Sequence, residues 1–104
     1  MTRVASSREI RAEPRIDLWL EGATLRERGR HAAAIVVHDL SPHGFRTEWP
    51  YQLERGTQLW LKLPGFEVWG AVVAWNRQFM LGCRFEIPLH PAVFQRIANV
   101  HTGK

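Results

Sequence analysis

The 104-residue chain has one cysteine, few lysines and no long apolar run. Because Cys83 has no partner within the chain, an internal disulfide is excluded. A helix that crosses a bilayer needs about 20 apolar residues, and neither such a run nor a signal-peptide core is present. These absences predict a reduced, cytoplasmic protein with no membrane association.

The motifs of common cofactor and metal sites are also missing. The chain contains no Walker loop, no Rossmann fingerprint and no HExxH, HxH or CxxC spacing. Each of these spacings is what brings phosphate-binding or metal-ligating groups together. We therefore expect neither a metal site nor a cofactor.

Three residues, Asp39, Ser41 and His43, have the chemistry of a catalytic triad without its geometry. Side chains two residues apart on a strand stand about 6–7 Å apart. A proton relay needs roughly 2.6–3.2 Å. The Gly-x-Ser-x-Gly elbow of many hydrolases is absent as well. We therefore expect a binding protein and not an enzyme.

The net charge of +4 depends on arginine, with twelve Arg against two Lys. The planar guanidinium matches phosphate oxygens and the guanine edge, which favours an anionic partner. A GC-rich genome explains the same bias without any function. The positions of the arginines are therefore more informative than their number.

Residues 1–15 differ from the rest of the chain because they lack hydrophobic periodicity. Four arginines fall in this segment, and Pro14 biases Glu13 toward an extended backbone. The sequence predicts a flexible arm over residues 1–15 and one domain over residues 16–100.

From Ile16 onward, short apolar alternations separated by turn residues predict strands, and helical spacing follows Pro88. Closure of six antiparallel strands into a barrel removes exposed edges, so we expect a mainly β fold with a short C-terminal α-helix. The predicted strands cover about residues 16–21, 31–39, 44–49, 57–63, 66–75 and 80–86, with a tight connection at Asn76-Arg77, and the helix begins at His90-Pro91 with the apolar stripe Val93, Phe94, Ile97 and Val100.

Two short motifs have the chemistry to bind a guanine nucleotide. Arg11 and Arg15 form an RxxxR element, whose side chains can reach phosphates and the guanine O6 and N7. Asp39, Ser41 and Gly44 form a DxSxxG element. Its carboxylate can accept from guanine N–H groups, its hydroxyl can donate or accept, and its glycine leaves room for a flat base or a tight turn. Each motif alone is weak, because DxSxxG also fits an ordinary turn.

Together and in this order, the motifs resemble those of the PilZ domain family. The resemblance extends to Gly70–Trp75, similar to the family's Gly-x-Val-x-x-Trp strand, and to Gly82–Phe85, similar to its Gly-x-x-Phe strand. It implies a six-stranded antiparallel PilZ-like β-barrel and a bacterial second-messenger receptor for cyclic di-GMP. By this resemblance, the arginines of the first motif take phosphate and guanine contacts and the second motif completes the site.

Two further arginines are secondary candidates for ligand contacts. Arg8 precedes Arg11 by three residues, and Arg46 shares a strand face with Gly44 if the strand is regular. Either side chain can also be a solvated surface charge.

Trp19 and Trp60 point outward if the inward-facing residues are Ile16, Leu18, Leu20, Leu59, Leu61 and Leu63. In the strand over about residues 66–75, alternation puts Trp69, Val73 and Trp75 on one face, and Trp69 joins the predicted outward group with Trp19 and Trp60. Outward Trp residues predict a protein-binding or self-association surface. Coverage by the helix or by a bulge is the alternative.

Two other functions stay open at this point. One is a PilZ-like protein-interaction module that does not bind nucleotide. The other is a small barrel that binds single-stranded nucleic acid by stacking and Arg contacts. The concentration of arginines in an arm, and not along a groove, argues against the second.

Overall fold

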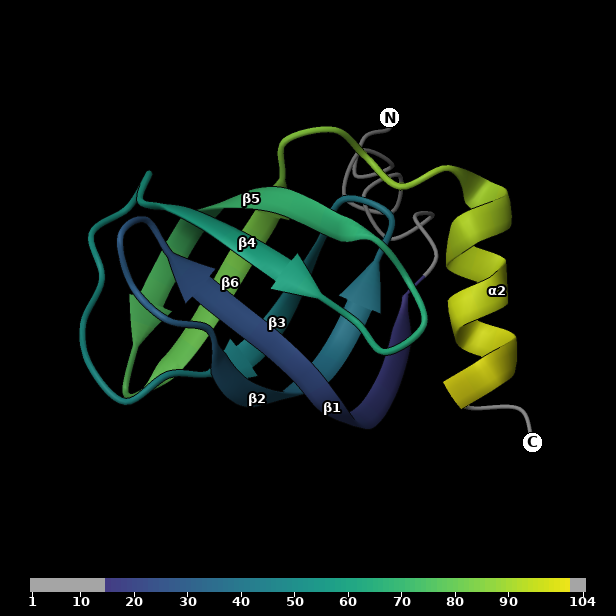
Figure 1. Ribbon diagram of the computed structural model, residues 1–104, viewed down its shortest axis with the longest axis horizontal. Helices are drawn as coiled ribbons and strands as arrows, with labels where there is room; N and C mark the ends of the chain where they lie inside the picture. The colour runs from purple at the N-terminus through teal and green to yellow at the C-terminus, as the bar shows by residue number, and fades with distance from the viewer. Residues whose placement is uncertain (1–14, 102–104) are drawn as a thin grey trace, which may run out of the picture.

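The computed structural model describes residues 15–101, apart from the side chains of Leu18, Trp19 and His101. Neighbouring strands are antiparallel, and the order β1-β2-β3-β6-β5-β4 closes into a barrel with the helix beside one end (Figure 1). The elements are β1 (Ile16–Glu27), β2 (Ala33–Ser41), β3 (Gly44–Glu48), β4 (Gln58–Lys62), β5 (Val68–Arg77), β6 (Met80–Phe85) and α2 (Pro91–His101). The predicted fold is confirmed, whereas the predicted arm lies, except for Arg15, outside the described residues.

Strand β1 is longer than predicted, because its 12 residues pair with two strands. It pairs with β2 along most of its length and with β4 from Thr24 to Glu27. Register shifts between Asp17 and Leu20 and between Leu20 and Ala23 interrupt the pairing with β2. Each such irregularity changes which residues face inward. Leu20 and Ala23 are therefore both buried, although strict alternation would put two residues three positions apart on opposite faces. A strict alternation starting at Ile16 misses this change.

The β5–β6 turn lies two residues later than predicted. Strand β5 continues through Arg77, and Gln78 and Phe79 form the turn with φ angles of 53° and 66°. Glycine or asparagine normally occupies such left-handed positions, so the sequence carries no local turn signal there. The side-chain Oδ1 of Asn76, just before the turn, accepts the backbone N–H of Leu53, and its Nδ2 donates to the carbonyl of Met80.

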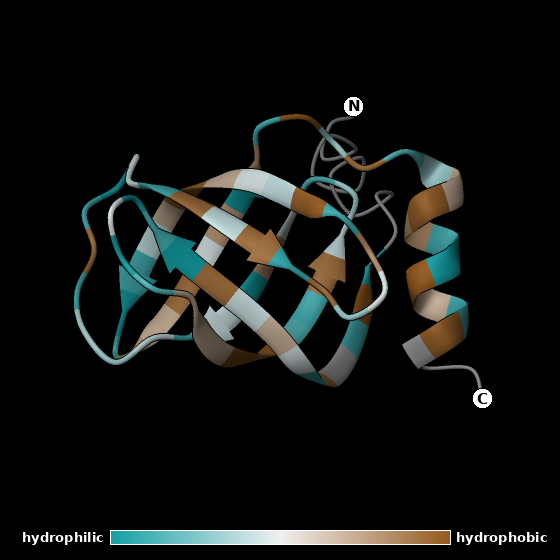
Figure 2. Cartoon of the chain, in the orientation of Figure 1, coloured by the Kyte–Doolittle hydropathy of each residue, from teal (hydrophilic) through white to brown (hydrophobic). Residues whose placement is uncertain are grey.

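Apolar and polar residues alternate along the strands, as the colours of Figure 2 show. Leu59, Leu61 and Leu63 are fully buried, which confirms the predicted inward face of β4. Each buried leucine contributes about 1.5–3 kcal/mol of hydrophobic free energy. The core thus follows the period of two that the sequence shows.

Helix α2 covers the end of the barrel core with Phe94 and Ile97. It begins where predicted, because the imidazole Nδ1 of His90 accepts the N–H of Ala92 at 2.9 Å and caps the first turn. Val100 is exposed, and Ala98 replaces it on the buried face that it shares with Phe94 and Ile97. No helix within residues 15–101 has the length and apolarity that crossing a membrane requires.

The predicted outward tryptophan group does not form as expected. Trp69 packs inward against Phe66 and Phe85, with ring centroids 6.0 and 6.1 Å apart. Trp60 lies on the outer face, but the guanidinium carbons of Arg26 and Arg28 lie 4.6 and 5.8 Å from its ring centroid. The side chain of Trp19 is outside the description. The inward position of Trp69 follows from its place beside the end of the core.

Successive connections along the chain lie at alternating ends of the antiparallel barrel (Figure 1). The β1–β2, β3–β4 and β5–β6 connections, residues 28–32, 49–57 and 78–79, form what we name the loop end. The β2–β3 turn and α2 lie toward the other end, the helix end. The cavity described below lies toward the helix end.

Gly44 is required by the close approach of β3 and β6, so Gly44→Ala should destabilise the barrel. A Cβ at this position would lie 2.1 Å from the carbonyl oxygen of Cys83. We expect a loss of about 1–3 kcal/mol in the free energy of unfolding, measured in urea.

Gly29→Ala is the matched control, because Gly29 has a φ of 75° and no neighbouring atom within 4 Å of an added Cβ. It should incur only the left-handed strain of about 1 kcal/mol. A smaller loss in Gly44→Ala than in Gly29→Ala would contradict the packing explanation.

Candidate functional site

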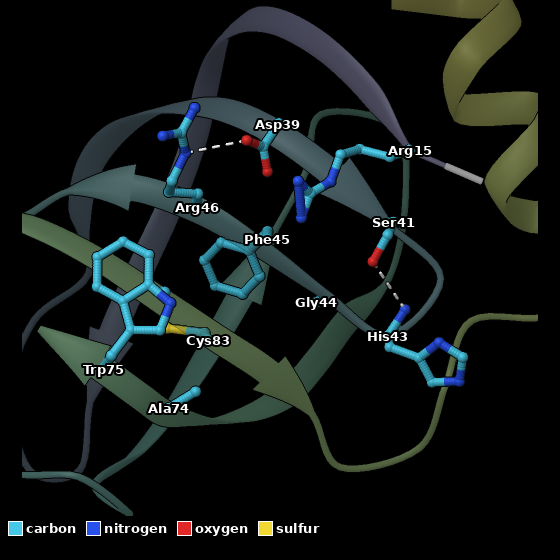
Figure 3. A pocket seen from close by; sticks show the side chains of 11 residues that line it. Arg15, Asp39, Ser41, His43, Gly44, Phe45, Arg46, Ala74, Trp75 and Cys83 are labelled. Atoms are coloured by element: carbon cyan, nitrogen blue, oxygen red, sulfur yellow. Dashed lines mark hydrogen bonds and ion pairs between the residues drawn. The ribbon is translucent and has the colours of Figure 1, made fainter. Parts of the chain in front are cut away.

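A cavity of about 370 Å³ opens on the outer face of the barrel, toward the helix end (Figure 3). This volume lies within the range of small-molecule sites, roughly 300–1,000 Å³. The lining includes four predicted site residues that the structure describes, and one of the secondary candidates. These five residues are Arg15, Asp39, Ser41, Gly44 and Arg46.

The floor of the cavity is a transverse row of residues across four neighbouring strands. Asp39 on β2 is opposite Arg46 on β3, Arg46 is opposite Gly82 on β6, and Gly82 is opposite Trp75 on β5. The row therefore places a carboxylate, a guanidinium and an indole ring side by side on one rigid sheet. Strands hold such groups more precisely than loops do.

Asp39 and Arg46 form the strongest polar contact of the row. The Nε of Arg46 lies 2.9 Å from Oδ2 of Asp39, and Asp39 is only 6% exposed. A buried carboxylate needs such a partner, because desolvation without one is costly. Arg46, a secondary candidate from the sequence, is therefore a structural partner of Asp39 in this structure.

Ser41 and Gly44 bound the tight β2–β3 turn. The hydroxyl oxygen of Ser41 accepts the backbone N–H of His43 at 3.2 Å, which is the local bonding of an ordinary Ser turn. Gly44 lies against the backbone of β6, so its lack of a side chain already serves the strand pairing. Two of the three residues of the DxSxxG motif thus have a structural explanation.

Arg15 immediately precedes β1. Its side chain extends across the cavity, and its guanidinium lies on the side of Asp39 (Figure 3). It adds a cation above the floor without being part of the sheet. Arg11 and Arg8, the other predicted contacts of this segment, lie outside the described residues. The structure therefore places one arginine of the RxxxR motif at the DxSxxG motif.

Trp75 is a cavity residue that reasoning from the sequence alternation missed. That alternation put Trp75 on one face with Trp69 and Val73, but the register shift between Val73 and Trp75 turns the indole outward. Its ring folds over Gly82, where a Cβ would lie 2.3 Å from the indole. A Gly opposite a Trp on paired strands is the signal that could have revealed this contact.

Contacts with Arg77 and Gly82 fix the position of the Trp75 ring. The guanidinium carbon of Arg77 lies 5.3 Å from the ring centroid, within the range of a cation–π contact. The indole is 37% exposed, so one part of it faces the cavity and solvent. A partly exposed, positioned ring is suited to stack on a flat base.

Cys83 is a buried residue of the cavity wall. Burial raises the pKa of its thiol to about 12, because the thiolate would be desolvated. The thiol is therefore protonated and unreactive at neutral pH.

Among the described residues, no group of three or more His, Cys, Asp or Glu side chains is arranged to hold a metal ion. No protein-family model matches the chain, and no curated protein is detectably similar in sequence. The resemblance to the PilZ domain family therefore stays a prediction from the two motifs and the two strand patterns of the sequence.

Gly82→Ala should displace the Trp75 ring from the cavity wall, because a methyl group and the indole cannot occupy the same space. We expect a change in near-ultraviolet circular dichroism, with the far-ultraviolet spectrum of the barrel retained. In a protein that already carries Trp75→Phe, Gly82→Ala should change the near-ultraviolet spectrum much less. An unchanged near-ultraviolet spectrum would show that the ring does not rest on Gly82.

The Cys83 thiol should resist DTNB at pH 8 in the native protein and react rapidly in urea. The raised pKa lowers the thiolate fraction roughly a thousandfold relative to an unfolded thiol. Labelling can be followed at 412 nm against free cysteine at about the same concentration. Fast native labelling would indicate that the cavity wall opens.

Proposed function

We propose that this protein is a PilZ-like receptor for cyclic di-GMP. The supporting observation is that residues from distant parts of the sequence, Arg15 and the Asp39–Gly44 motif, line one cavity. The pairing of Ile16 with Leu40 brings Arg15 beside this motif, so that a guanidinium, a carboxylate and a hydroxyl line the same cavity. These groups match the phosphate and the donor and acceptor edges of a guanine nucleotide.

The chemistry of the cavity fits one guanine base with its adjoining phosphate. Asp39 accepts from guanine N1–H and N2–H through the oxygen that Arg46 does not hold. Arg15 reaches the phosphate or the O6 and N7 edge with its planar donors. Trp75 supplies a stacking surface, since base stacking on an aromatic ring is worth about 1–3 kcal/mol.

Arg11 and Arg8 complete the proposed site from the segment before Arg15. They contact the second phosphate and guanine, so that this segment is drawn over the bound nucleotide. The segment ordered over the ligand then changes the surface that a protein partner contacts. Ligand binding is thereby converted into a change in protein interaction.

On this proposal the protein acts by binding and not by catalysis. Asp39 and Ser41, the polar side chains of the DxSxxG motif, each contact another group of the protein. Asp39 is paired with Arg46 at 2.9 Å, and the Ser41 oxygen accepts a backbone N–H. Neither is positioned as a base beside a nucleophile, which nucleophilic catalysis needs.

Calorimetric titration with cyclic di-GMP tests the ligand. Arg15→Ala should weaken binding about 10–100-fold, the value of one bidentate arginine contact. Arg55→Ala is the matched control, because Arg55 is an exposed arginine at the loop end of the barrel. No heat at micromolar ligand, or equal affinities of the two variants, would refute the proposal and favour a PilZ-like interaction module that does not bind nucleotide.

Selectivity tests the role assigned to Asp39 separately from overall affinity. Cyclic di-AMP has no N1–H donor for the carboxylate, so wild-type protein should prefer cyclic di-GMP by about tenfold or more. Asp39→Asn should reduce this preference more than Arg15→Ala does. A preference unchanged by Asp39→Asn would remove Asp39 from guanine recognition.

A further inference from the structure

Arg46 is a cavity residue whose hydrogen-bond donors are only partly used by the protein itself. Its Nε lies 2.9 Å from Oδ2 of Asp39, and within residues 15–101 no other carboxylate or hydrogen-bond acceptor contacts the side chain. A guanidinium carries five N–H donors in a planar fork, so the donors of both Nη groups remain available. The side chain is 44% exposed and lines the cavity at Asp39, where a ligand can meet these donors.

The contact with Asp39 also holds this guanidinium in place. Asp39 on β2 and Arg46 on β3 are opposite each other in the sheet, and Asp39 is 6% exposed. Because separation would leave a buried carboxylate without a partner, the contact restrains the arginine side chain. A restrained side chain loses less conformational entropy when a ligand binds than a free surface arginine does. The Nη donors of Arg46 are therefore preorganised at the cavity floor.

The two side chains together present an acceptor beside donors (Figure 3). Oδ1 of Asp39 is the acceptor, because Nε of Arg46 contacts Oδ2, and the Nη groups of Arg46 are the donors. The edge of guanine that pairs with cytosine has the complementary order, with the donors N1–H and N2–H beside the acceptor O6. Adenine has an amino group in place of O6 and an unprotonated N1, so it would place donor against donor and acceptor against acceptor.

We propose that Arg46 determines guanine specificity by donating to O6, while Asp39 accepts N1–H and N2–H. The inference rests on the proposed function, and it adds to that site a residue that belongs to neither motif. It also gives the arginines different roles. Arg46 contacts the base, and Arg15, which is not part of the sheet, is left for the phosphate.

The row of residues across the cavity floor favours a base contact over a phosphate contact for Arg46. The order across neighbouring strands is Asp39, Arg46, Gly82 and Trp75. The Trp75 ring folds over Gly82, the residue opposite Arg46. A base that stacks on this ring therefore lies beside Arg46, with Asp39 one strand further on. Both hydrogen-bonding groups are on the same side of the stacking surface.

Arg46→Lys separates a contact with O6 from support of Asp39 alone. The lysine ammonium is a single cationic point that can still pair with Asp39, but it lacks the second nitrogen that reaches O6. In calorimetric titration the variant should bind cyclic di-GMP about tenfold or more weakly than wild-type protein does. Its urea midpoint should stay close to that of the wild type, because the charge pair is kept. Arg55→Lys, the same change at an exposed site of the loop end, should leave the affinity unchanged.

Cyclic di-IMP shows whether Asp39 stays in place in the variant. Its hypoxanthine base keeps O6 and N1–H but lacks the N2 amine, so the preference for cyclic di-GMP over cyclic di-IMP measures the contact of that amine with Asp39. This preference should be the same in wild type and Arg46→Lys, while both ligands lose the same factor in affinity. A smaller preference in the variant would mean that Arg46 acts only through Asp39, and it would overturn the inference.

Two other results would also overturn it. Equal affinity of wild type and Arg46→Lys for cyclic di-GMP would leave Arg46 as a structural partner of Asp39 only. An equal loss with cyclic di-AMP, which has the same phosphates but no O6, would assign Arg46 to the phosphate. The two proposals fail differently. No binding of cyclic di-GMP by wild-type protein refutes the proposed function and this inference together, whereas wild-type binding with an unaffected Arg46→Lys refutes this inference alone.

Discussion

Closure of the sheet by β1 is the constraint on which the rest of the structure depends. One 12-residue strand pairs with β2 from Ile16 to Leu25 and with β4 from Thr24 to Glu27. It can do so only because irregular pairing at two places lets it bend across the barrel. Without this bend the sheet would stay open at β4, and the leucines of that strand would lose the face against which they pack.

The same closure determines where side chains of interest meet. In a closed antiparallel barrel, the register of each strand pair is determined by its neighbours on both sides. The row from Asp39 through Arg46 and Gly82 to Trp75 is a result of that register. The loop end follows as well, because the connections after β1, β3 and β5 must lie on one side. The cavity at Asp39 is thus a consequence of the topology.

The sequence predicts much of this arrangement where local pattern and tertiary packing agree. The alternation of Leu59, Leu61 and Leu63 indicates β4 and its inward face, and His90-Pro91 indicates the start of α2. It fails where pairing overrides the pattern. The parity change in β1 and the outward turn of Trp75 both follow from register shifts, which no single segment encodes.

Within the candidate site, Asp39, Ser41, Gly44 and Arg15 line one cavity. Their role in ligand binding stays a prediction. The close contact of Arg46 with Asp39 depends on cross-strand pairing. The sequence alone does not reveal it, because it depends on which residues of two strands come to lie opposite each other.

Gly44 has a consequence for how such proteins diverge by descent. Its missing side chain is required by the carbonyl of Cys83 whether or not a nucleotide is ever bound. If the proposed nucleotide binding were lost, the barrel would still require this glycine. A glycine at this position is therefore informative about the fold, whereas Asp39 and Arg15 are the positions informative about the proposed ligand.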